Sequence, residues 1–360
     1  MTISTAEPWI RQPLRGLRPY TPPARSGGSD LLLDLNEGAP LSPQDWLDRA
    51  FARISPDTLR RYPDASPLEA RLAARLGVSR ECVLVTNGGD DAIDRVCRSC
   101  LGPGDEIVLP SPTFEMIARS AELPGGVCVR VPWPGAEFPL EPVLAAMTDR
   151  TRLIAVVSPN NPSGATITAD QLRALSAAAP DRLLMVDLAY TEFADKDLTP
   201  LALGLPNAVV IRTLSKAYGM AALRVGYAVG QPGTINALRA AGGPFPCSSF
   251  SLAAADAALD LPEGVLSARV ARIREERSAL TALLAARGVQ VTPSQANFVL
   301  ARLSDPDPLL AALADRGIRV KCFATPELAD ALRIGLPGDP TDFARLTSAL
   351  TEILDAGASQ

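Results

Sequence analysis

Histidine is absent from all 360 residues of this chain. Without it there can be no Ser-His-Asp triad, no Cys-His nucleophile pair and no zinc site with histidine ligands. Proton transfer near neutral pH must therefore come from a lysine with a shifted pKa, a carboxylate, a tyrosine or a cofactor. A lysine at the end of a buried strand is consequently a candidate for the catalytic group.

Several other features are scarce. The net charge is −5 and no long basic run occurs, which argues against nucleic acid as the main partner. No apolar stretch approaches the ~20 residues that span a bilayer. The first residues lack the apolar core of a signal peptide, so we expect a cytoplasmic protein. Cys97 and Cys100 form a C-x-x-C within an expected helix, but no second pair accompanies them, so we expect no metal site.

Short apolar β-type runs alternate with helical patterns between residues 82 and 241. This alternation predicts an α/β fold with a mostly parallel, doubly wound sheet covered by helices on both faces. Farther along, a long helical pattern over 249–287 and four strand-like runs predict a smaller α+β domain. The four runs are 289–292, 297–302, 318–323 and 331–336. The predicted parts are an N-terminal arm, a large domain and a small C-terminal domain that packs with the arm, over residues 1–40, 41–245 and 246–360.

Lys216 follows the β-type run 208–213 and lies within the sequence Thr-Leu-Ser-Lys-Ala-Tyr-Gly. A lysine at a strand end can project into a cleft, where desolvation favours the neutral amine and permits a Schiff base with a carbonyl group. A single lysine is by default a surface residue. Whether Lys216 is interpreted as a catalytic residue therefore depends on the groups that accompany it.

Three further loops carry chemistry that fits such a lysine. The turn 87–91 precedes a helix, whose N-terminus and open backbone amides favour an anion. Two prolines fix the loop 158–164 and present Asn161. Asp187 closes a buried apolar run, where a carboxylate needs a cationic partner such as a pyridinium nitrogen. With Lys216, these groups suit pyridoxal 5′-phosphate, whose carbonyl, phosphate and ring nitrogen each find a partner.

The chain resembles the fold-type-I aminotransferases that depend on pyridoxal phosphate, and among them the histidinol-phosphate aminotransferase family. The resemblance covers nearly the whole chain, with the motifs in the family's order. The motifs are RYPD at 61–64, NGGDDAI at 87–93, SPTFEM at 111–116, SPNNPSG at 158–164, VDLAY at 186–190, TLSKAYGMAALRVGY at 213–227 and LRIGLP at 332–337. The resemblance implies an aspartate-aminotransferase-like fold and a homodimer with shared active sites. It also implies amino transfer between an L-amino acid or amino-phosphate and a 2-oxo acid such as 2-oxoglutarate.

The resemblance implies a role for each matching residue. Lys216 would hold the cofactor through an imine, and Asp187 would keep the pyridine nitrogen protonated. Asn161 and Tyr190 would hydrogen-bond the ring O3′, and Phe114 would stack on the ring face. Lys216, Asp187 and Tyr190 would be the catalytic set. The residues implied around the cofactor phosphate are Gly89, Asp90, Ser215, Arg224 and, from the neighbouring subunit, Tyr62.

The resemblance also implies a substrate site. Arg333 would bind the α-carboxylate, because a planar guanidinium matches a carboxylate through two hydrogen bonds. Asn161 and Tyr20, the latter in RPYTPP, would line the same site. Lys321 stands where the family commonly has an arginine for the substrate phosphate. Arg319 could share that task, since residues two apart on one strand face the same side.

Three positions depart from the family pattern. Leu188 replaces a glutamate, Ala222 replaces a glycine, and the lysine at 321 lacks the forked geometry of arginine. The substrate therefore stays open between histidinol phosphate and a related aromatic, basic or phosphorylated amino acid. An aromatic amino-acid aminotransferase and a decarboxylase resembling threonine-phosphate decarboxylase share most of the motifs. A transcription regulator of this type would need a DNA-binding domain, for which the arm has no room.

Overall fold

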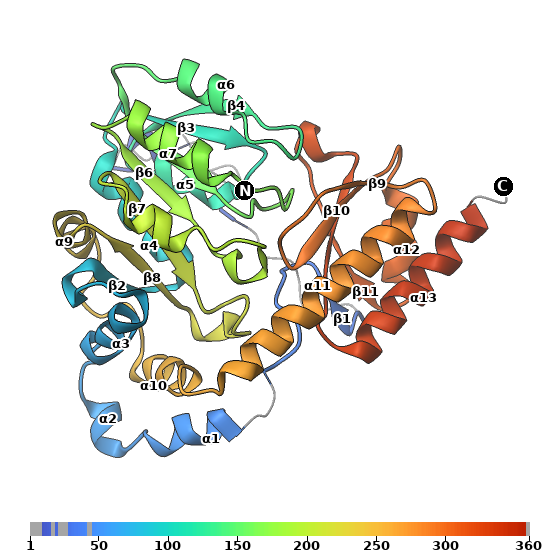
Figure 1. Cartoon of the computed structure of the whole chain (residues 1–360), viewed down its shortest axis with the longest axis horizontal. Helices are drawn as coiled ribbons and strands as arrows, with labels where there is room; N and C mark the ends of the chain where they lie inside the picture. Colours follow the sequence, from blue (N-terminus) through green and yellow to red (C-terminus); the bar gives the residue numbers. More distant parts are fainter. Residues whose placement is uncertain (1–8, 16–18, 21–27, 42–44, 358–360) are drawn as a thin grey trace.

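A seven-stranded sheet forms the centre of the larger part of the molecule in the computed structural model, which describes residues 9–15, 19–20, 28–41 and 45–357 (Figure 1). The strands are β2 (Val83–Asn87), β3 (Glu106–Ser111), β4 (Val127–Pro132), β5 (Thr151–Val157), β6 (Leu183–Asp187), β7 (Ala208–Thr213) and β8 (Val225–Gly230). Their order in the sheet is β2-β8-β7-β6-β5-β3-β4. Strand β8 is antiparallel to both neighbours, and the other neighbouring pairs are parallel. The prediction of a mostly parallel α/β sheet is confirmed.

Helices cover both faces of this sheet because successive strand residues point to opposite sides. Those on one face are α4 (Gly88–Cys100), α5 (Glu115–Glu122) and α9 (Pro232–Ala240). Those on the other face are α6 (Leu140–Ala145), α7 (Ala169–Ala178) and α8 (Thr199–Leu203). Ile211 of β7 belongs to the core under α4 and α5, whereas its neighbour Val210 belongs to the core under α7. One strand thus serves two apolar layers.

A second sheet lies at the other end of the molecule (Figure 1). Its elements and the helices packed on it are β9 (Gln290–Thr292), β10 (Phe298–Arg302), β12 (Lys321–Cys322), β13 (Ala331–Gly335), α11 (Glu263–Ala285), α12 (Asp307–Ala314) and α13 (Pro340–Gly357). The strand order is β12-β13-β10-β9, and all pairs are antiparallel. Leu332 and Ile334 of β13 belong to the core formed with these helices. Alternation along the strand therefore directs Arg333 to the opposite face.

Residues 31–33 of the arm pack beside this second sheet. Strand β1 (Leu31–Leu32) pairs in parallel with β11 (Ile318–Arg319). Beyond it, the amide of Gly335 donates to the carbonyl of Leu33 over 3.1 Å. Asn36 is buried and has a left-handed φ of 57°, a conformation that asparagine tolerates better than most residues.

The remaining helices cover the β2–β8 side of the large sheet. They are α1 (Asp45–Ala52), α2 (Pro56–Arg60), α3 (Ser66–Leu76) and α10 (Ser249–Ala258). Helix α10 contacts α1 and α3, and Leu252 shares a core with Leu72 and Val229. No helix in the described ranges has the length and apolar character needed to cross a membrane. The predicted domain boundaries stay predictions.

Two predicted elements are each divided in two. The helical pattern over 249–287 forms α10 and α11, and Pro262 stands immediately before α11. Proline has no amide hydrogen and disfavours a helical residue before it, so α10 does not continue into α11. The run 318–323 forms β11 and β12, because the pairing changes at Val320 from the arm strand β1 to β13. The prediction of one continuous strand there is wrong.

Candidate active site

Lys216 lies in the loop after β7, and local hydrogen bonds fix this loop. The hydroxyl of Thr213 donates to Ser215 Oγ over 2.9 Å and accepts from the Ser215 amide over 3.1 Å. The amine of Lys216 donates to the carbonyl oxygen of Leu35 over 2.9 Å. Its Nζ also lies 5.7 Å from the centre of the Tyr190 ring. The amine is therefore held between the lysine loop, the arm and the segment that follows β6.

Asp187 ends β6 and is buried. Its carboxylate accepts a hydrogen bond from the Ala189 amide over 3.0 Å. Burial raises the pKa of Asp187 to about 7; the Ala189 amide lowers it, the charge of Asp90 raises it, and the amine of Lys216 lowers it. A buried carboxylate with so little compensation favours a cation beside it. Asp90 and Lys216 are thus the charged side chains that act on the Asp187 carboxylate.

The start of α4 forms a site for an anion. Gly88 has a φ of 78°, and a Cβ on Gly226 would lie 2.5 Å from the carbonyl carbon of Gly88, so glycine permits this close approach of two backbones. The first amides of a helix have no partner within the helix. Arg224 Nη2 donates to Asp90 Oδ2 over 3.0 Å. Helix amides with a guanidinium beside them are suited to a phosphate group.

Arg333 enters the site from β13. Its Nη2 donates to the carbonyl of Asp34 over 2.5 Å, and its Nη1 donates to Asn161 Oδ1. The guanidinium carbon lies 5.3 Å from the centre of the Phe298 ring. Burial lowers the pKa of Arg333. Its Nε has no partner among the described residues, so this buried fork keeps a donor for a bound anion.

Lys321 is the cross-strand partner of Arg333 in the β12–β13 ladder. Directly paired residues of antiparallel strands project from the same face, so the two cations stand side by side. The Nζ of Lys321 lies 5.9 Å from the centre of the Phe323 ring. Tyr20 is close enough to respond to this region: burial and the charge of Glu115 raise its pKa, and Arg333 lowers it. Arg319 lies on β11, which pairs with β1 in a separate two-stranded sheet.

Two buried asparagines connect the arm to the site. Asn36 Nδ2 donates to the Tyr190 hydroxyl over 3.1 Å, and Asn297 Nδ2 donates to the carbonyl of Asn36 over 3.1 Å. The side-chain oxygens of both asparagines lack a partner in the part of the chain that the structure describes. Asn297 is not among the residues predicted from the sequence. The available signal was a polar residue at the start of the apolar run 297–302, which indicates a buried group that needs a partner.

Nine of the thirteen predicted site residues gather, and Lys321 and Tyr20 lie near Arg333. Those brought together at the ends of β5, β6 and β7, at the start of α4 and on β13 are Gly89, Asp90, Asn161, Asp187, Tyr190, Ser215, Lys216, Arg224 and Arg333. Phe114 stands just before α5, half-buried against the core of that face. Tyr62 is 81% exposed and stacks on Phe245, with ring centres 4.6 Å apart. The roles of these residues stay predictions.

The geometry fits pyridoxal 5′-phosphate. Three features match this cofactor: a buried carboxylate with little compensation suits the ring nitrogen, a glycine-lined helix start beside a guanidinium suits the phosphate, and an amine suits the carbonyl carbon. Among the described residues there is no cluster of acidic, histidine or cysteine side chains that could hold a metal ion.

Comparisons with known proteins agree with this chemistry. Residues 31–350 match the family model of aminotransferase class I and II. A histidinol-phosphate aminotransferase from Xylella fastidiosa is 37% identical over 361 residues, which cover 96% of each chain. An aromatic amino acid aminotransferase from Thermobifida fusca is 36% identical and covers 96% of this chain and 97% of its own.

A solved structure supports the same assignment. The crystal structure of histidinol-phosphate aminotransferase from Sinorhizobium meliloti in complex with pyridoxal-5′-phosphate superposes with a TM-score of 0.83 at 27% identity, and covers 91% of this chain and 92% of that one. The predictions of fold type, aminotransferase activity and pyridoxal 5′-phosphate as cofactor are confirmed by these matches, which give less support to the decarboxylase alternative. The chain belongs to the class I and II aminotransferase family.

Proposed function

We propose that this enzyme transfers the amino group of histidinol phosphate, in histidine synthesis, to a 2-oxo acid such as 2-oxoglutarate. The observation that carries the proposal is the pair of cations Lys321 and Arg333, side by side on one face of the second sheet. Two adjacent cations match the double charge of a phosphate group. For the acceptor, Arg333 takes the α-carboxylate. Curated relatives with 37% identity are named histidinol-phosphate aminotransferases, which supports this substrate.

An aromatic amino-acid donor is the second candidate. The relative from Thermobifida fusca carries that name. Two aromatic rings also lie beside the cations: Phe323 near Lys321, and Phe298 near Arg333. The Phe323 ring favours a donor with an aromatic side chain, and Tyr20 adds a second ring at the border of the site, whereas Phe298 is fully buried. The two candidates differ in whether Lys321 is needed, since only a phosphorylated donor brings a second negative charge to the pair of cations.

In this proposal the loops at the sheet edge hold the cofactor. When bound, pyridoxal 5′-phosphate supplies an aldehyde for amines and a protonated ring that withdraws electrons from the substrate Cα. Asp187 pairs with the ring nitrogen, and Asn161 and Tyr190 hydrogen-bond the ring oxygen. Phe114 stacks on the ring. The residues that hold the phosphate are Gly89, Asp90, Ser215 and Arg224, with Tyr62 of the neighbouring subunit.

Lys216 is the proposed base and acid of the reaction. It would hold the cofactor at rest, and its free amine would take the proton from the substrate Cα and return it as the acid of the reaction. The carbonyl of Leu35 keeps the amine directed into the site. No histidine is present to take over this task, and only three lysines occur in the chain. Asn161 shares a hydrogen bond with Arg333, so the group that orients the ring oxygen also orients the anion-binding fork.

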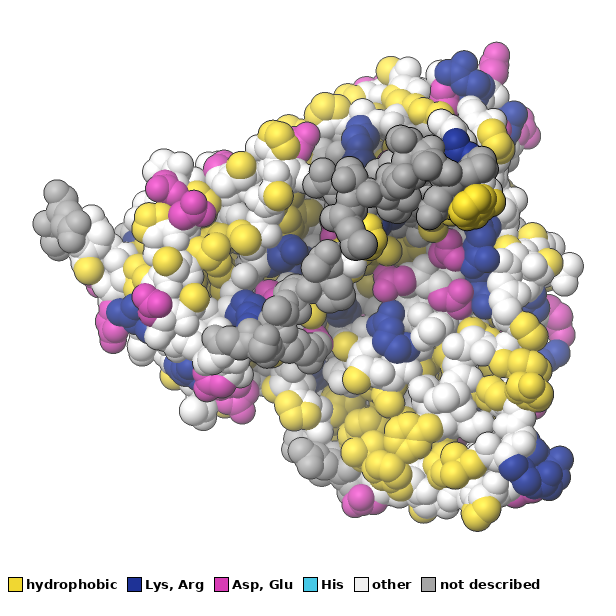
Figure 2. All heavy atoms as spheres, turned by 180° about the vertical axis from the view of Figure 1, so that it is seen from behind, with side chains coloured by type: hydrophobic (Ala, Val, Ile, Leu, Met, Phe, Trp, Pro, Cys, Tyr) yellow, Lys and Arg dark blue, Asp and Glu magenta, His cyan; other side chains and the backbone are white. Residues whose placement is uncertain are grey.

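We further propose a cytoplasmic homodimer in which Tyr62 completes the site of its neighbour. Figure 2 views the molecule from behind and shows hydrophobic side chains gathered at its lower end, on the side where α1 and α10 lie. Exposed apolar residues of that part of the chain include Phe51, Leu59, Tyr62 and Phe245. Large exposed apolar patches are unusual in monomers and favour an interface. The six free cysteines fit a reducing compartment.

Lys216 is expected to be the lysine that borohydride fixes to the cofactor. Reduction of the protein with pyridoxal 5′-phosphate should label the peptide that contains Lys216, because that amine lies beside Asp187 and the anion site. Lys216→Ala should lose the label and nearly all turnover. Lys196→Ala and Lys321→Ala are matched controls that should keep it. Mass spectrometry of digested protein gives the position, and a label on Lys196 or Lys321 would contradict the assignment.

The cofactor-free protein is expected to lose stability through Asp187 as pH rises. The folded-state pKa of about 7 lies above the unfolded value of about 3.9, so the folded protein binds this proton more tightly. The contribution is complete below pH ~4 and is lost as pH rises to ~7. Asp187→Asn removes it. As pH rises over this range, the Tm of the wild type should therefore fall relative to the Tm of Asp187→Asn. A Tm difference that does not depend on pH would refute the burial effect.

Subunit mixing is expected to restore activity when Tyr62 acts across the interface. In a dimer of Lys216→Ala with Tyr62→Ala, one composite site carries both lesions and the other is intact. Activity should therefore appear in the mixture, provided that Tyr62→Ala alone is severely impaired. The control mixes Lys216→Ala with Asp187→Asn, whose lesions lie in the same part of the site, and should not recover. A fully active monomer by light scattering would end the idea.

Lys321 is expected to matter for a phosphorylated donor only. Lys321→Ala should lower kcat/KM for histidinol phosphate, because one charge-assisted hydrogen bond is lost. The decrease should correspond to a loss of roughly 1.5–3 kcal/mol of transition-state stabilisation. The loss for phenylalanine should be small. Lys196→Ala is the control for removing a lysine elsewhere. Equal losses for both donors would show that Lys321 does not contact the phosphate. With phenylalanine, a 2-oxo acid product formed without release of CO2 separates amino transfer from decarboxylation.

A further inference from the structure

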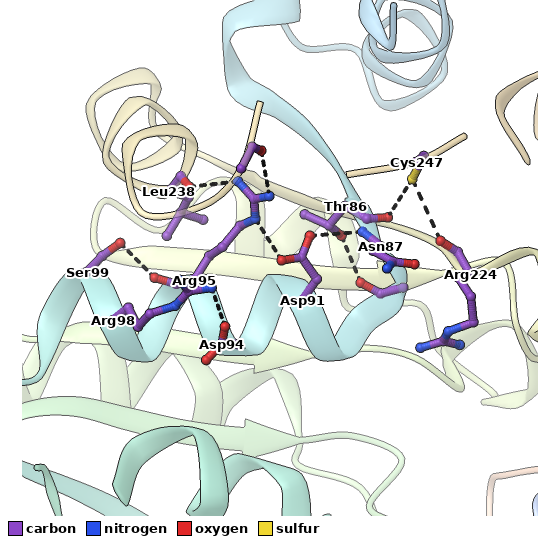
Figure 3. A network of polar contacts seen from close by, with 12 residues as sticks. Thr86, Asn87, Asp91, Asp94, Arg95, Arg98, Ser99, Arg224, Leu238 and Cys247 are labelled. Carbon is purple, nitrogen blue, oxygen red and sulfur yellow. Dashed lines mark hydrogen bonds and ion pairs between the residues drawn. The ribbon is translucent and has the colours of Figure 1, made fainter. Parts of the chain in front are cut away.

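Arg95 occupies the centre of a polar network behind the start of α4 (Figure 3). Its side chain is 3% exposed. Nε donates to Asp91 Oδ1 over 2.9 Å, Nη1 donates to the carbonyl of Leu238 over 3.3 Å, and Nη2 donates to the carbonyl of Gly243 over 3.1 Å. A buried guanidinium is costly unless its donors are used, and here all three nitrogens have acceptors. One arginine therefore joins α4 to the end of α9 and the segment that follows it.

The space for this guanidinium depends on a glycine. A Cβ on Gly242 would lie 2.0 Å from the Cζ of Arg95 and 2.2 Å from its Nη1. Any larger residue at this position must displace the end of the arginine side chain. The backbone of the 238–243 segment is thus shaped to receive Arg95, and the contact can be disturbed from either side.

Asp91 connects Arg95 to the turn that precedes α4. Its Oδ1 accepts from Arg95, and its Oδ2 accepts from the amide of Asn87 over 2.9 Å. Asn87 is the residue before α4, so Asp91 fixes the backbone that leads into Gly89 and Asp90 (Figure 3). A carboxylate held by Arg95 on one oxygen cannot turn away from the amide on the other. The chain of contacts runs from Arg95 through Asp91 to the amide of the turn.

A second contact joins the same segments. The thiol of Cys247 donates to the carbonyl of Thr86 over 3.2 Å and to that of Arg224 over 3.7 Å. Burial raises the pKa of Cys247 to about 11, so the thiol keeps its proton for this purpose. The segment 238–247 is therefore connected to the turn in two ways. Leu238 and Gly243 act through Arg95 and Asp91, and Cys247 contacts the turn directly.

We propose that Arg95 is a positioning residue: through Asp91 it sets the backbone of the turn that binds the cofactor phosphate. This inference rests on the proposed function of that turn. Arg95 itself contacts neither cofactor nor substrate. Its effect reaches the ligand only through the direction of the turn amides, so it should act on the phosphate and spare the other parts of the cofactor.

The test compares two ligands that differ only in the phosphate, pyridoxal 5′-phosphate and pyridoxal. Their Kd values are measured by absorbance titration on the full-length, cofactor-free protein. Arg95→Met should weaken pyridoxal 5′-phosphate about tenfold or more, as expected when charge-assisted hydrogen bonds to a phosphate are misaligned. Pyridoxal should change by less than about twofold. Hydrogen exchange of the Asn87 amide should accelerate in the same variant.

The chain offers a matched control and a second variant. Arg98 lies on the same helix, pairs with Asp94 four residues before it and is 44% exposed. Arg98→Met removes an equivalent ion pair and should leave both Kd values unchanged. Gly242→Ala keeps Arg95 and Asp91 but displaces the guanidinium, so it should reproduce the effect of Arg95→Met. If Arg95→Met does not fold, Gly242→Ala tests the role of Arg95 in its place.

The outcomes separate the inference from the proposed function. A wild type that binds pyridoxal as tightly as pyridoxal 5′-phosphate overturns both, because the turn then has no phosphate to hold. A wild type that prefers the phosphorylated ligand, with variants that keep the same preference, supports the turn and overturns the role of Arg95. Equal weakening of both ligands in Arg95→Met and Gly242→Ala shows a structural role only and also overturns it.

Discussion

The backbone of residues 33–36 holds the two halves of the site together. Its carbonyl groups accept from Lys216, which belongs to the large sheet, and from Arg333, which belongs to the second sheet. Asn36 adds a side-chain contact to Tyr190 and accepts from Asn297. Each of these donors is buried or half-buried, so a loss of the arm would leave polar groups without partners. The relative position of amine and guanidinium therefore depends on one short stretch of chain.

Buried charges in this molecule are compensated to different degrees, and the difference separates ligand sites from structural contacts. Each nitrogen of Arg95 has a protein acceptor, so its charge is compensated within the fold. The Nε of Arg333 has no partner among the described residues. The pKa of Asp187 is raised because the effect of burial is larger than the opposing effects of the Ala189 amide and Lys216. Incomplete compensation costs stability, but it leaves binding capacity where a charged ligand can supply the missing partner.

Much of the large sheet and its chemistry follows from local sequence. Apolar runs between helical patterns predict buried parallel strands, and the polar groups that follow these runs must meet at one edge of the sheet. Lys216, Asp187 and Asn161 are therefore expected to lie together on the basis of local sequence alone. The turn at Gly88 and Gly89 is visible for the same reason, since adjacent glycines before a helix indicate a close backbone approach. The family motifs extend these expectations to the second sheet through Arg333.

Contacts between distant segments were decided only by the tertiary structure. The hydrogen bond from Lys216 to Leu35 spans 181 residues, and that from Arg95 to Gly243 spans 148, and neither leaves a local pattern. The run 318–323 illustrates the same limit: its β-type residues are evident, but the change of pairing partner at Val320 depends on where the arm lies. Sequence periodicity reports which side of an element is buried. It does not report which other element covers that side, because this depends on the packing of the whole chain.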